Sequence, residues 1–502
     1  MNDIINFFET SQYEYLKEKD KSYLKNTSQF FTPYDTACKM ISTIDFSIFR
    51  NTDTLYILEP SAGCGILIAS LVLHILRNCS YIKKVHVDAY EYDIDVCNIL
   101  LSNFKFFDEY INKNSILIFS YNVINDNFIT KNKEEWFKGS FSSRYDIIIS
   151  NPPYKKINQS SEEAIIMKDI VYGQPNIYTL FIGMSLKLLK TDGVYIVLSP
   201  RNYLSGEYSK KLRKFIFSNY SLICIHSFSK RSIFKSVNQE VIISTFINNN
   251  NHNKVNISHD GYSNFFINFN DIIFDEELIS ILVPRTTNEV MLLKTIRTLR
   301  YSLGDLGLKI SVGTIVQFRN ENDIKKDVYT KYYSPLLISP DIQPNNKINY
   351  FERENKRKTH NKSISAKNKY LIKNSNYVLI RKVTAKDDTD LIVTSVLDKS
   401  YFNHDLIGLD NNLLYIHSID KSEIDLELCY GLYCFINSKQ FKDFYFSING
   451  THTINVTDFN NIKFPDIITL KKLGSNIFNT DFSEKTCSNL IEEHLKITNK
   501  KM

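Results

Sequence analysis

The chain has no long apolar stretch. No run of about 20 uncharged apolar residues, the length that a membrane-spanning helix needs, occurs in its 502 residues. The first 20 residues carry Asp, Glu and Lys throughout and lack the apolar core of a signal peptide. These absences predict a cytoplasmic protein with no membrane partner.

Cysteine is scarce and scattered. The chain has 8 cysteines, and the closest pair, Cys429 and Cys434, lacks the spacing of a zinc ribbon. We therefore expect reduced thiols and no metal site.

Charge is only mildly biased. The formal net charge is +6 and the sequence pI is about 8.6, which allows a polyanionic partner without requiring one. The length predicts two or three domains, because domains usually hold roughly 100–200 residues.

The most informative stretch is the apolar run 147–149, which ends at Asn151-Pro152-Pro153-Tyr154. An Ile-rich run reads as a buried strand, and two prolines cannot continue a ladder, so the tetrapeptide lies at the strand's carboxyl end. Ligands of open α/β sheets bind at that edge. The Asn151 side-chain oxygen and the Pro152 carbonyl could both accept hydrogens from a flat R-NH2 group, and Tyr154 offers a ring for stacking. A strand followed by a proline turn would give the same sequence without a site.

A second motif, upstream in the chain, favours a ligand site over a simple proline turn. An apolar strand, 55–58, runs into Glu59-Pro60-Ser61-Ala62-Gly63-Cys64-Gly65, and a helical run follows over 66–76. Gly63 and Gly65 let the backbone approach a ligand closely. The dinucleotide and P-loop patterns are both absent, so the acid Glu59 points to a positively charged ligand group such as an α-ammonium. The alternative is an acid that supports the helix dipole.

Two further strands end in polar residues. The strand 84–90 leads to Glu91, the position at which a carboxylate typically binds ribose hydroxyls, and Tyr92 could flank an adenine. The strand 115–120 leads to Asn122, which could bond an adenine edge, with Asp126 as the reserve candidate. Turn formation explains either residue nearly as well.

Four motifs resemble, in their order along the chain, those of a known family. They are the Phe-Thr-Pro at 31–33, the segment 59–65, the strand that leads to Glu91, and the tetrapeptide at 151–154. It is the gamma class of S-adenosylmethionine-dependent DNA methyltransferases, the N6-adenine modification enzymes of type II restriction systems. The motifs cover residues 29–247, and weaker phrases cover the remainder. The tetrapeptide alone also occurs in RNA and protein-glutamine methyltransferases.

The resemblance implies a fold and partners. A Rossmann-like, mostly parallel, seven-stranded methyltransferase sheet is expected in a catalytic domain over 1–250. A mixed α/β target-recognition domain is expected over 251–502, with 251–284 as a connector. The cofactor would be S-adenosylmethionine without a metal. The partner would be double-stranded DNA, met by a monomer in the bacterial cytoplasm, and a cognate restriction endonuclease would act separately.

The resemblance also implies the site residues. Those expected to be catalytic are Asn151, Pro152, Pro153 and Tyr154. Those expected to bind the cofactor are Phe31, Thr32, Pro33, Glu59, Ser61, Ala62, Gly63, Gly65, Glu91, Tyr92, Asn122 and Asn151. An aromatic before the last strand would stack on the flipped base opposite Tyr154, which assigns Phe234, with Phe228 as competitor and a core phenylalanine as the alternative.

Cations gather with interleaved Tyr and Phe over residues 347–386, the composition of a phosphate-contacting face. The predicted DNA-binding residues are Arg353, Lys356, Arg357, Lys358, Arg381 and Lys382. A solvated surface would carry the same charges.

Three alternatives stay open beside adenine-N6 methylation. Cytosine-N4 transfer is the nearest, but a serine often replaces the asparagine there, so Asn151 favours adenine. Methylation of RNA or of a protein glutamine has less use for a long basic C-terminal half. A DNA-binding protein with a vestigial catalytic fold would not need the intact motifs. Because no nuclease motif precedes Phe31, we expect no DNA cleavage.

Overall fold

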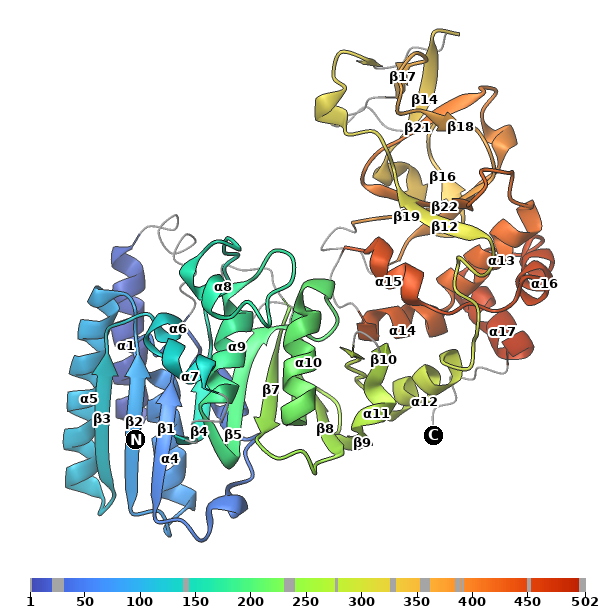
Figure 1. The fold of residues 1–502 in the computed structure, drawn as a ribbon. Coiled ribbons are helices and arrows are strands. Elements are labelled where there is room, and N and C mark those ends of the chain that lie inside the picture. Colours follow the sequence, from blue (N-terminus) through green and yellow to red (C-terminus); the bar gives the residue numbers. More distant parts are fainter. Residues whose placement is uncertain are drawn as a thin grey trace. The chain divides into compact units, whose positions relative to one another are not determined.

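The computed structural model describes residues 2–19, 31–138, 144–229, 240–275, 279–325, 331–352, 362–383, 390, 392–448 and 453–495. The chain divides into two compact units, Met1–Thr286 and Thr287–Met502 (Figure 1). Within the described residues, no helix combines the length and apolarity that a membrane crossing demands.

The first unit is built on a nine-stranded sheet with the order β3-β2-β1-β4-β5-β7-β6-β8-β9. Its strands are β1 (Thr54–Glu59), β2 (Lys84–Tyr90), β3 (Ile118–Ile124), β4 (Tyr145–Ser150), β5 (Leu189–Pro200), β6 (Ser221–Ser227), β7 (Val241–Ile247), β8 (Lys254–His259) and β9 (Phe265–Asn268). Strands β1 to β5 pair in parallel, and β7 runs antiparallel between β5 and β6. The predicted mostly parallel methyltransferase sheet is therefore confirmed.

The sheet has two strands more than the seven expected. β8 pairs with β6 and β9 pairs with β8, so much of the stretch 251–284 belongs to the sheet although we expected a connector there. The polar segment before β8 is a turn held against β5: Asn248 Nδ2 donates to the Leu189 carbonyl at 2.9 Å, and Asn249 Nδ2 donates to Asp192 Oδ1 at 2.7 Å. An Asn-rich composition fits a bonded turn as well as a linker.

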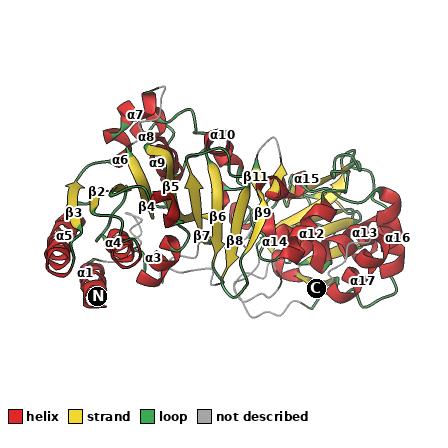
Figure 2. Cartoon of the chain, turned by 90° about the horizontal axis from the view of Figure 1, so that it is seen from below, coloured by secondary structure: helices red, strands yellow, loops and turns green. Residues whose placement is uncertain are grey.

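Two helical layers cover the sheet (Figure 2). One face carries α1 (Asn2–Glu18), α3 (Tyr34–Ile41), α4 (Ile66–Asn78) and α5 (Ile94–Asn114). The opposite face carries α6 (Phe128–Lys131), α7 (Lys133–Phe137), α8 (Glu162–Ile166), α9 (Ile177–Lys187) and α10 (Lys210–Asn219). The unit continues into α11 (Phe269–Ile272), β10 (Ile273–Asp275) and β11 (Ser280–Ile281).

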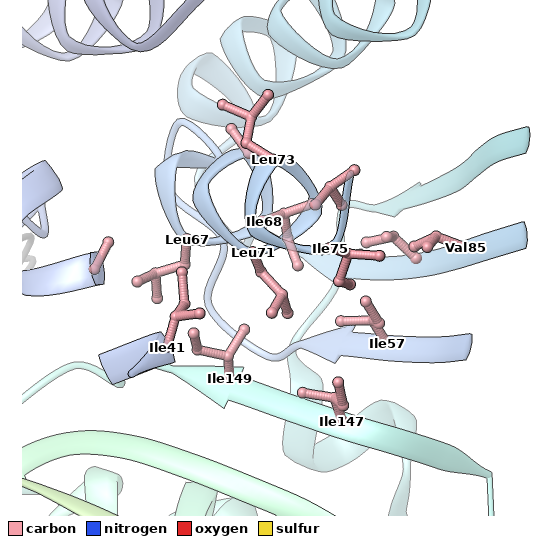
Figure 3. Close-up of a cluster of buried hydrophobic side chains, with 14 of the residues drawn as sticks. Ile41, Ile57, Leu67, Ile68, Leu71, Leu73, Ile75, Val85, Ile147 and Ile149 are labelled. Carbon is pink, nitrogen blue, oxygen red and sulfur yellow. The ribbon is translucent and has the colours of Figure 1, made fainter. Parts of the chain in front are cut away.

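The centre of this unit is the packing of α4 on β1 and β4 (Figure 3). Leu71 and Ile75 of α4 lie against Ile57 of β1 and Ile147 of β4, and all four are fully buried. Each such side chain contributes roughly 1.5–3 kcal/mol on burial. Leu55, Ile57 and Leu58 of β1 and residues 147–149 of β4 are fully buried, and this packing fixes the loops that leave the carboxyl ends of the two strands.

The second unit is mixed α/β. One sheet joins β12 (Leu308–Val312), β22 (Leu413–Ser418), β19 (Tyr377–Arg381) and β20 (Thr394–Leu397), and another joins β13 (Ile324–Lys325), β17 (Ser363–Ser365), β14 (Tyr333–Leu337), β21 (Leu406–Leu409) and β18 (Ile372–Lys373). A short pair is formed by β15 (Ile342–Gln343) and β16 (Lys347–Ile348). The helices are α12 (Thr287–Ile296), α13 (Leu426–Asn437), α14 (Lys439–Ile448), α15 (Val456–Asn461), α16 (Ile467–Ile477) and α17 (Glu484–Leu495).

Helices α13 and α16 approach very closely. A Cβ atom at Gly431 would lie 1.9 Å from the Leu470 carbonyl oxygen, and one at Gly474 would lie 1.9 Å from the Glu427 carbonyl oxygen. Glycine is required at both crossing points because no side chain fits between the two backbones.

Candidate active site

A cavity of about 810 Å³ lies where the carboxyl ends of β1, β2, β3 and β4 meet. The loops that follow these strands supply most of its wall, and α1, the segment before α3, and α9 close it. The predicted residues that line it are Phe31, Thr32, Glu59, Ser61, Ala62, Gly63, Glu91, Tyr92, Asn151, Pro152 and Pro153. Motifs that lie far apart in the sequence thus share one site, at the sheet edge where ligands of such folds bind.

The loop between β1 and α4 needs its glycines. Gly63 has φ +53°, and a Cβ atom there would lie 3.0 Å from a ring carbon of Phe31. Gly65 has φ +90° at the start of α4, where a Cβ atom would lie 2.6 Å from the Phe104 ring. Both residues occupy the left-handed region that side chains disfavour. Gly63 forms part of the cavity wall, whereas Gly65 shapes the turn behind it.

Glu59 ends β1 inside the cavity wall. Its side chain is 1% exposed, and its Oε2 atom has no hydrogen-bond partner among the described residues. Burial, followed by the negative charge of Glu91, raises the pKa of Glu59 well above its ordinary value. A buried carboxyl with one oxygen that lacks a hydrogen-bond partner is suited to receive a positively charged hydrogen-bond donor.

Glu91 follows β2 and is oriented by backbone groups. Its two carboxylate oxygens accept 2.9 Å hydrogen bonds from the amides of Gly63 and Asp93. Burial raises the pKa of Glu91, and the two amide bonds oppose that shift. The loop from β3 supports the same turn, because Asn125 Nδ2 donates to the Glu91 and Tyr92 carbonyls at 2.8 and 3.1 Å. Each carboxylate oxygen keeps a lone pair for a ligand hydroxyl.

Asn122 and Asp126, the two candidates for the adenine-edge contact, differ in their position relative to the cavity. The described lining includes Asp126 but not Asn122. β3 continues to Ile124, so Asn122 lies within the strand and pairs with Asp88 of β2, whereas Asp126 lies in the turn beyond. Of the two candidates, Asp126 is thus the one that lines the cavity. Pro33 lies behind the cavity, at the position preceding α3, and its carbonyl accepts from the Ala37 amide at 3.0 Å.

The side chain of Asn151 is held on two sides. Its Nδ2 donates to Thr32 Oγ1 at 3.1 Å, and its Oδ1 accepts from the Tyr154 hydroxyl at 2.7 Å. Its backbone carbonyl accepts from Ser61 Oγ at 3.1 Å. The segment before α3 and the loop after β1 therefore fix the orientation of the residue that directly follows β4. An amide oxygen has two lone pairs and can accept more than one hydrogen bond.

Tyr154 lies behind this amide, outside the described cavity lining. Its hydroxyl also donates to the Leu198 carbonyl at 3.1 Å, and its ring meets the Tyr178 ring edge-on with centroids 6.1 Å apart. Burial, helped by the neighbouring Tyr178 and Tyr195, raises the pKa of Tyr154 well above its ordinary value. The hydroxyl therefore keeps its proton and acts as a donor.

Phe234 and Phe228 are the two candidates for stacking on the target base. Phe234 lies outside the described residues. Its competitor Phe228 packs against the main core, with its ring edge-on to His226 at 4.9 Å and the ammonium of Lys39 5.2 Å from its centroid.

Several lining residues were not predicted from the sequence. Phe128 and Phe181 form an aromatic pair with centroids 5.2 Å apart, and Gln12 comes from α1. Neither Phe181 nor Gln12 belongs to any of the sequence motifs. These contacts are long-range, and we find no local signal that could have revealed them.

Across the described ranges, no three His, Cys, Asp or Glu side chains form a metal-ligand group.

Four of the predicted DNA-binding residues lie outside the described residues, namely Arg353, Lys356, Arg357 and Lys358. Arg381 ends β19, and its Nε donates to the Ile342 carbonyl at 2.6 Å, so this side chain supports the strand pair β15–β16; Lys382 follows it directly.

This sheet and the cavity over its carboxyl edge define a Rossmann-like α/β fold with a ligand-sized site at the sheet edge. Residues 65–234 match the family described as Eco57I restriction-modification methylase. The chain is 28% identical over 462 residues to the type II methyltransferase M.PstI of Providencia stuartii, covering 88% of each chain. It is 27% identical over 470 residues to M.BsuBI of Bacillus subtilis, covering 90% of each. Over most of its length the chain is thus similar to type II restriction-modification methyltransferases.

Proposed function

We propose that this protein is a site-specific DNA methyltransferase that transfers a methyl group from S-adenosylmethionine to the N6 amino group of adenine. The observation that carries the proposal is the fixed Asn151 amide beside a cavity with a vacant buried carboxyl oxygen. The similarity to type II methyltransferases over both units supports duplex DNA as the substrate. A cognate restriction endonuclease would be a separate partner.

The cavity fits S-adenosylmethionine. Glu59 Oε2 would accept from the α-ammonium, the Glu91 carboxylate from the ribose hydroxyls, and the turn at Tyr92 and Asp126 would hold the adenine end. The left-handed Gly63 keeps the wall free of a side chain. When bound, S-adenosylmethionine supplies a methyl group activated by a positively charged sulfur.

Asn151 and Pro152 would activate the target amine. The adenine N6 lone pair is delocalised into the ring, and two oxygen acceptors, Asn151 Oδ1 and the Pro152 carbonyl, would draw its hydrogens and favour a pyramidal nitrogen. As the nitrogen formed its bond to the methyl carbon, the methyl–sulfur bond would break with its electron pair left on sulfur, giving S-adenosylhomocysteine. The same oxygens would stabilise the positive charge that passes to the nitrogen. The nitrogen then loses one proton to water, so no group with an unusual pKa has to act as a base.

The target base has to leave the duplex to reach this site. Extrusion costs roughly a few kcal/mol, and stacking of the base on an aromatic ring offsets part of this cost. The ring of Tyr154, whose hydroxyl bonds to Asn151 Oδ1, would supply one face. Phe234 remains our proposed partner on the other.

A surface of the second unit has the composition that nucleic acid requires. Phe318, Tyr332 and Tyr370 are 71%, 65% and 44% exposed. Each carries the cation of a neighbouring residue near its ring: Arg319 at 5.5 Å, Lys331 at 5.3 Å and Lys369 at 5.1 Å. We call these six residues the aromatic–cation surface.

Hydrogen bonds bring the three pairs to the same end of the five-stranded sheet. Asn368 Nδ2 donates to Asp323 Oδ2 at 2.6 Å and Asn320 Oδ1 at 3.0 Å, which joins the turn before Tyr370 to the turn after Phe318. The Ala366 amide donates to the Tyr332 carbonyl at 2.8 Å. Cations for phosphates and exposed rings for sugars and bases support DNA contact here, beside the contacts that we propose for Arg353, Lys356, Arg357, Lys358, Arg381 and Lys382.

The alternatives are weaker. Cytosine-N4 transfer uses the same geometry, and Asn151 in place of serine favours adenine. RNA or protein-glutamine methylation leaves the second unit without a function. A vestigial fold would not need to keep the Thr32–Asn151–Tyr154 hydrogen bonds.

The test is to incubate the full chain with labelled S-adenosylmethionine and bacterial genomic DNA, then to analyse the digested nucleosides by mass spectrometry. We expect N6-methyladenine, and none with the Asn151→Ala variant, which should still bind the cofactor. N4-methylcytosine would replace the adenine assignment, and label on RNA or protein alone would overturn DNA as the substrate.

A further inference from the structure

Helix α1 belongs to the cavity wall although it lies outside the family match at 65–234. It lies beside α4 and α5 on one face of the sheet (Figure 2). Tyr15 Oη donates to Asp93 Oδ2 at 3.2 Å, and Lys19, just beyond the helix, forms a 2.8 Å ion pair with Asp95. Both acids lie at the start of α5 and line the cavity, so α1 is anchored at its rim.

A second connection leads from α1 to the glycine loop. Asn103 of α5 is 1% exposed, and its Nδ2 donates both to Ser11 Oγ at 2.9 Å and to the Cys64 carbonyl at 2.8 Å. The Tyr15 ring meets the Phe31 ring edge-on at 5.8 Å, and Phe31 covers Gly63. The residue between Ser11 and Tyr15 that lines the cavity is Gln12.

Gln12 is 8% exposed, and its Nε2 atom is buried without a hydrogen-bond partner among the described residues. A buried amide without a partner destabilises a fold, so such a group in a cavity wall indicates a missing ligand. The other side-chain amides of the described lining are engaged: Asn127 Nδ2 donates to Glu163 at 2.8 Å, and Asn151 Nδ2 donates to Thr32. Gln12 therefore offers an unused donor.

We propose that Gln12 Nε2 donates a hydrogen bond to the methionine carboxylate of bound S-adenosylmethionine. The inference rests on the proposed cofactor. Glu59 and Gln12 are the described lining residues that hold a buried side-chain atom without a partner, one an acceptor and one a donor. The α-ammonium and the carboxylate share one carbon atom, so an acceptor for the first and a donor for the second form a complementary pair. Helix α1 thereby becomes part of the cofactor site.

The experiment is calorimetric binding of two ligands to the full chain: S-adenosylmethionine and its decarboxylated analogue, which keeps the ammonium and lacks the carboxylate. The variants are Gln12→Ala and the similar-sized Gln12→Leu, which preserves packing. We expect both variants to bind S-adenosylmethionine roughly tenfold or more weakly than the parent, since a hydrogen bond to a charged group is lost. Affinity for the decarboxylated analogue should stay unchanged.

The matched control is Glu14→Ala, which removes an exposed side chain from the same helix and should bind both ligands like the parent. Thermal unfolding of each variant checks that the fold is intact. Unchanged binding of S-adenosylmethionine by both Gln12 variants, or an equal loss for both ligands, would overturn the assignment. If the parent chain itself failed to bind S-adenosylmethionine, the proposed function would fall instead, so the two failures are distinguishable.

Discussion

The Tyr154 hydroxyl lies 2.7 Å from Asn151 Oδ1 and donates a hydrogen bond to it. The acceptor that we assign to the target amine is therefore positioned by a tyrosine three residues further along the chain. The same hydroxyl reaches the Leu198 carbonyl of β5 at 3.1 Å, which links the tetrapeptide to the neighbouring strand. Tyr154 can thus act both through its ring and through its hydroxyl.

Removal of the hydroxyl alone separates these two contributions. Tyr154→Phe keeps the ring for stacking but removes the hydrogen bond from the hydroxyl to Asn151 Oδ1, and one hydrogen bond of this kind contributes about 0.5–1.5 kcal/mol. We expect single-turnover methyl transfer to slow by roughly three- to tenfold, with cofactor affinity little changed. The exposed Tyr262 provides a matched Tyr→Phe control. A rate equal to that of the parent would show that the hydroxyl does not position Asn151.

Glu59 predicts a dependence of stability on pH. Burial and Glu91 raise its folded-state pKa well above the ordinary 4.5, so between these values the folded protein keeps a proton that the unfolded chain has lost. Stability therefore falls as pH rises through this window. The Glu59→Gln variant cannot titrate there, so without cofactor it should unfold at a higher temperature than the parent at about pH 8, and the difference should vanish below about pH 4.5.

The same variant should lose cofactor affinity. Without the carboxylate charge, Glu59→Gln should bind S-adenosylmethionine roughly tenfold more weakly. A variant that is more stable but binds less well is the signature of a residue kept for its ligand rather than for the fold. Equal melting temperatures of parent and variant across the pH range would contradict the burial argument.

Much of the fold and the site was predictable because it rests on local patterns. The runs 55–58 and 147–149 are rich in apolar residues because they form the central strands β1 and β4, and the proline pair follows the point where β4 stops. The glycines at 63 and 65 indicate a loop whose backbone conformation is unfavourable for residues with a side chain. The mostly parallel sheet follows from these signals.

The remainder depends on contacts between distant segments. Asn122 was misplaced relative to the cavity because strand β3 extends past Ser120, and a polar strand end looks like a loop. β8 buries only Val255 and Ile257, too few apolar residues to distinguish a strand from a connector. Gln12 lies in a polar-looking helix, and nothing near it in the sequence indicates that α1 packs beside the glycine loop.

Gly63 offers a test of the cavity wall with an internal control. Gly63→Ala should lower stability by about 1–2 kcal/mol because of its positive φ, and its Cβ would push the Phe31 ring aside and weaken cofactor binding. Gly261 has φ +83°, and a Cβ atom added at this position would have no neighbouring atom within 4 Å. Gly261→Ala should thus carry a similar stability loss in chemical unfolding without any change in cofactor affinity. Equal cofactor binding by both variants would remove Gly63 from the site.

The aromatic–cation surface predicts how DNA affinity responds to salt. Replacing Arg319, Lys331 and Lys369 by Gln removes three cations, and if each neutralises a phosphate, the slope of log affinity against log salt should become shallower by about 2.7, at roughly 0.9 per contact. Replacing Phe318, Tyr332 and Tyr370 by Ala should weaken binding while leaving the slope nearly unchanged, because stacking on rings releases few counterions.

The control for these variants removes the same charge from the same unit. Lys399, Lys439 and Lys471 each pair with an acid, at 2.9, 2.6 and 2.6 Å, so their replacement by Gln should change the slope little. Fluorescence anisotropy of a labelled duplex at several salt concentrations measures all three variants. If the control flattened the slope as much as the surface variant, net charge alone would explain the effect. The phosphate contacts would then have to be sought among residues 353–358.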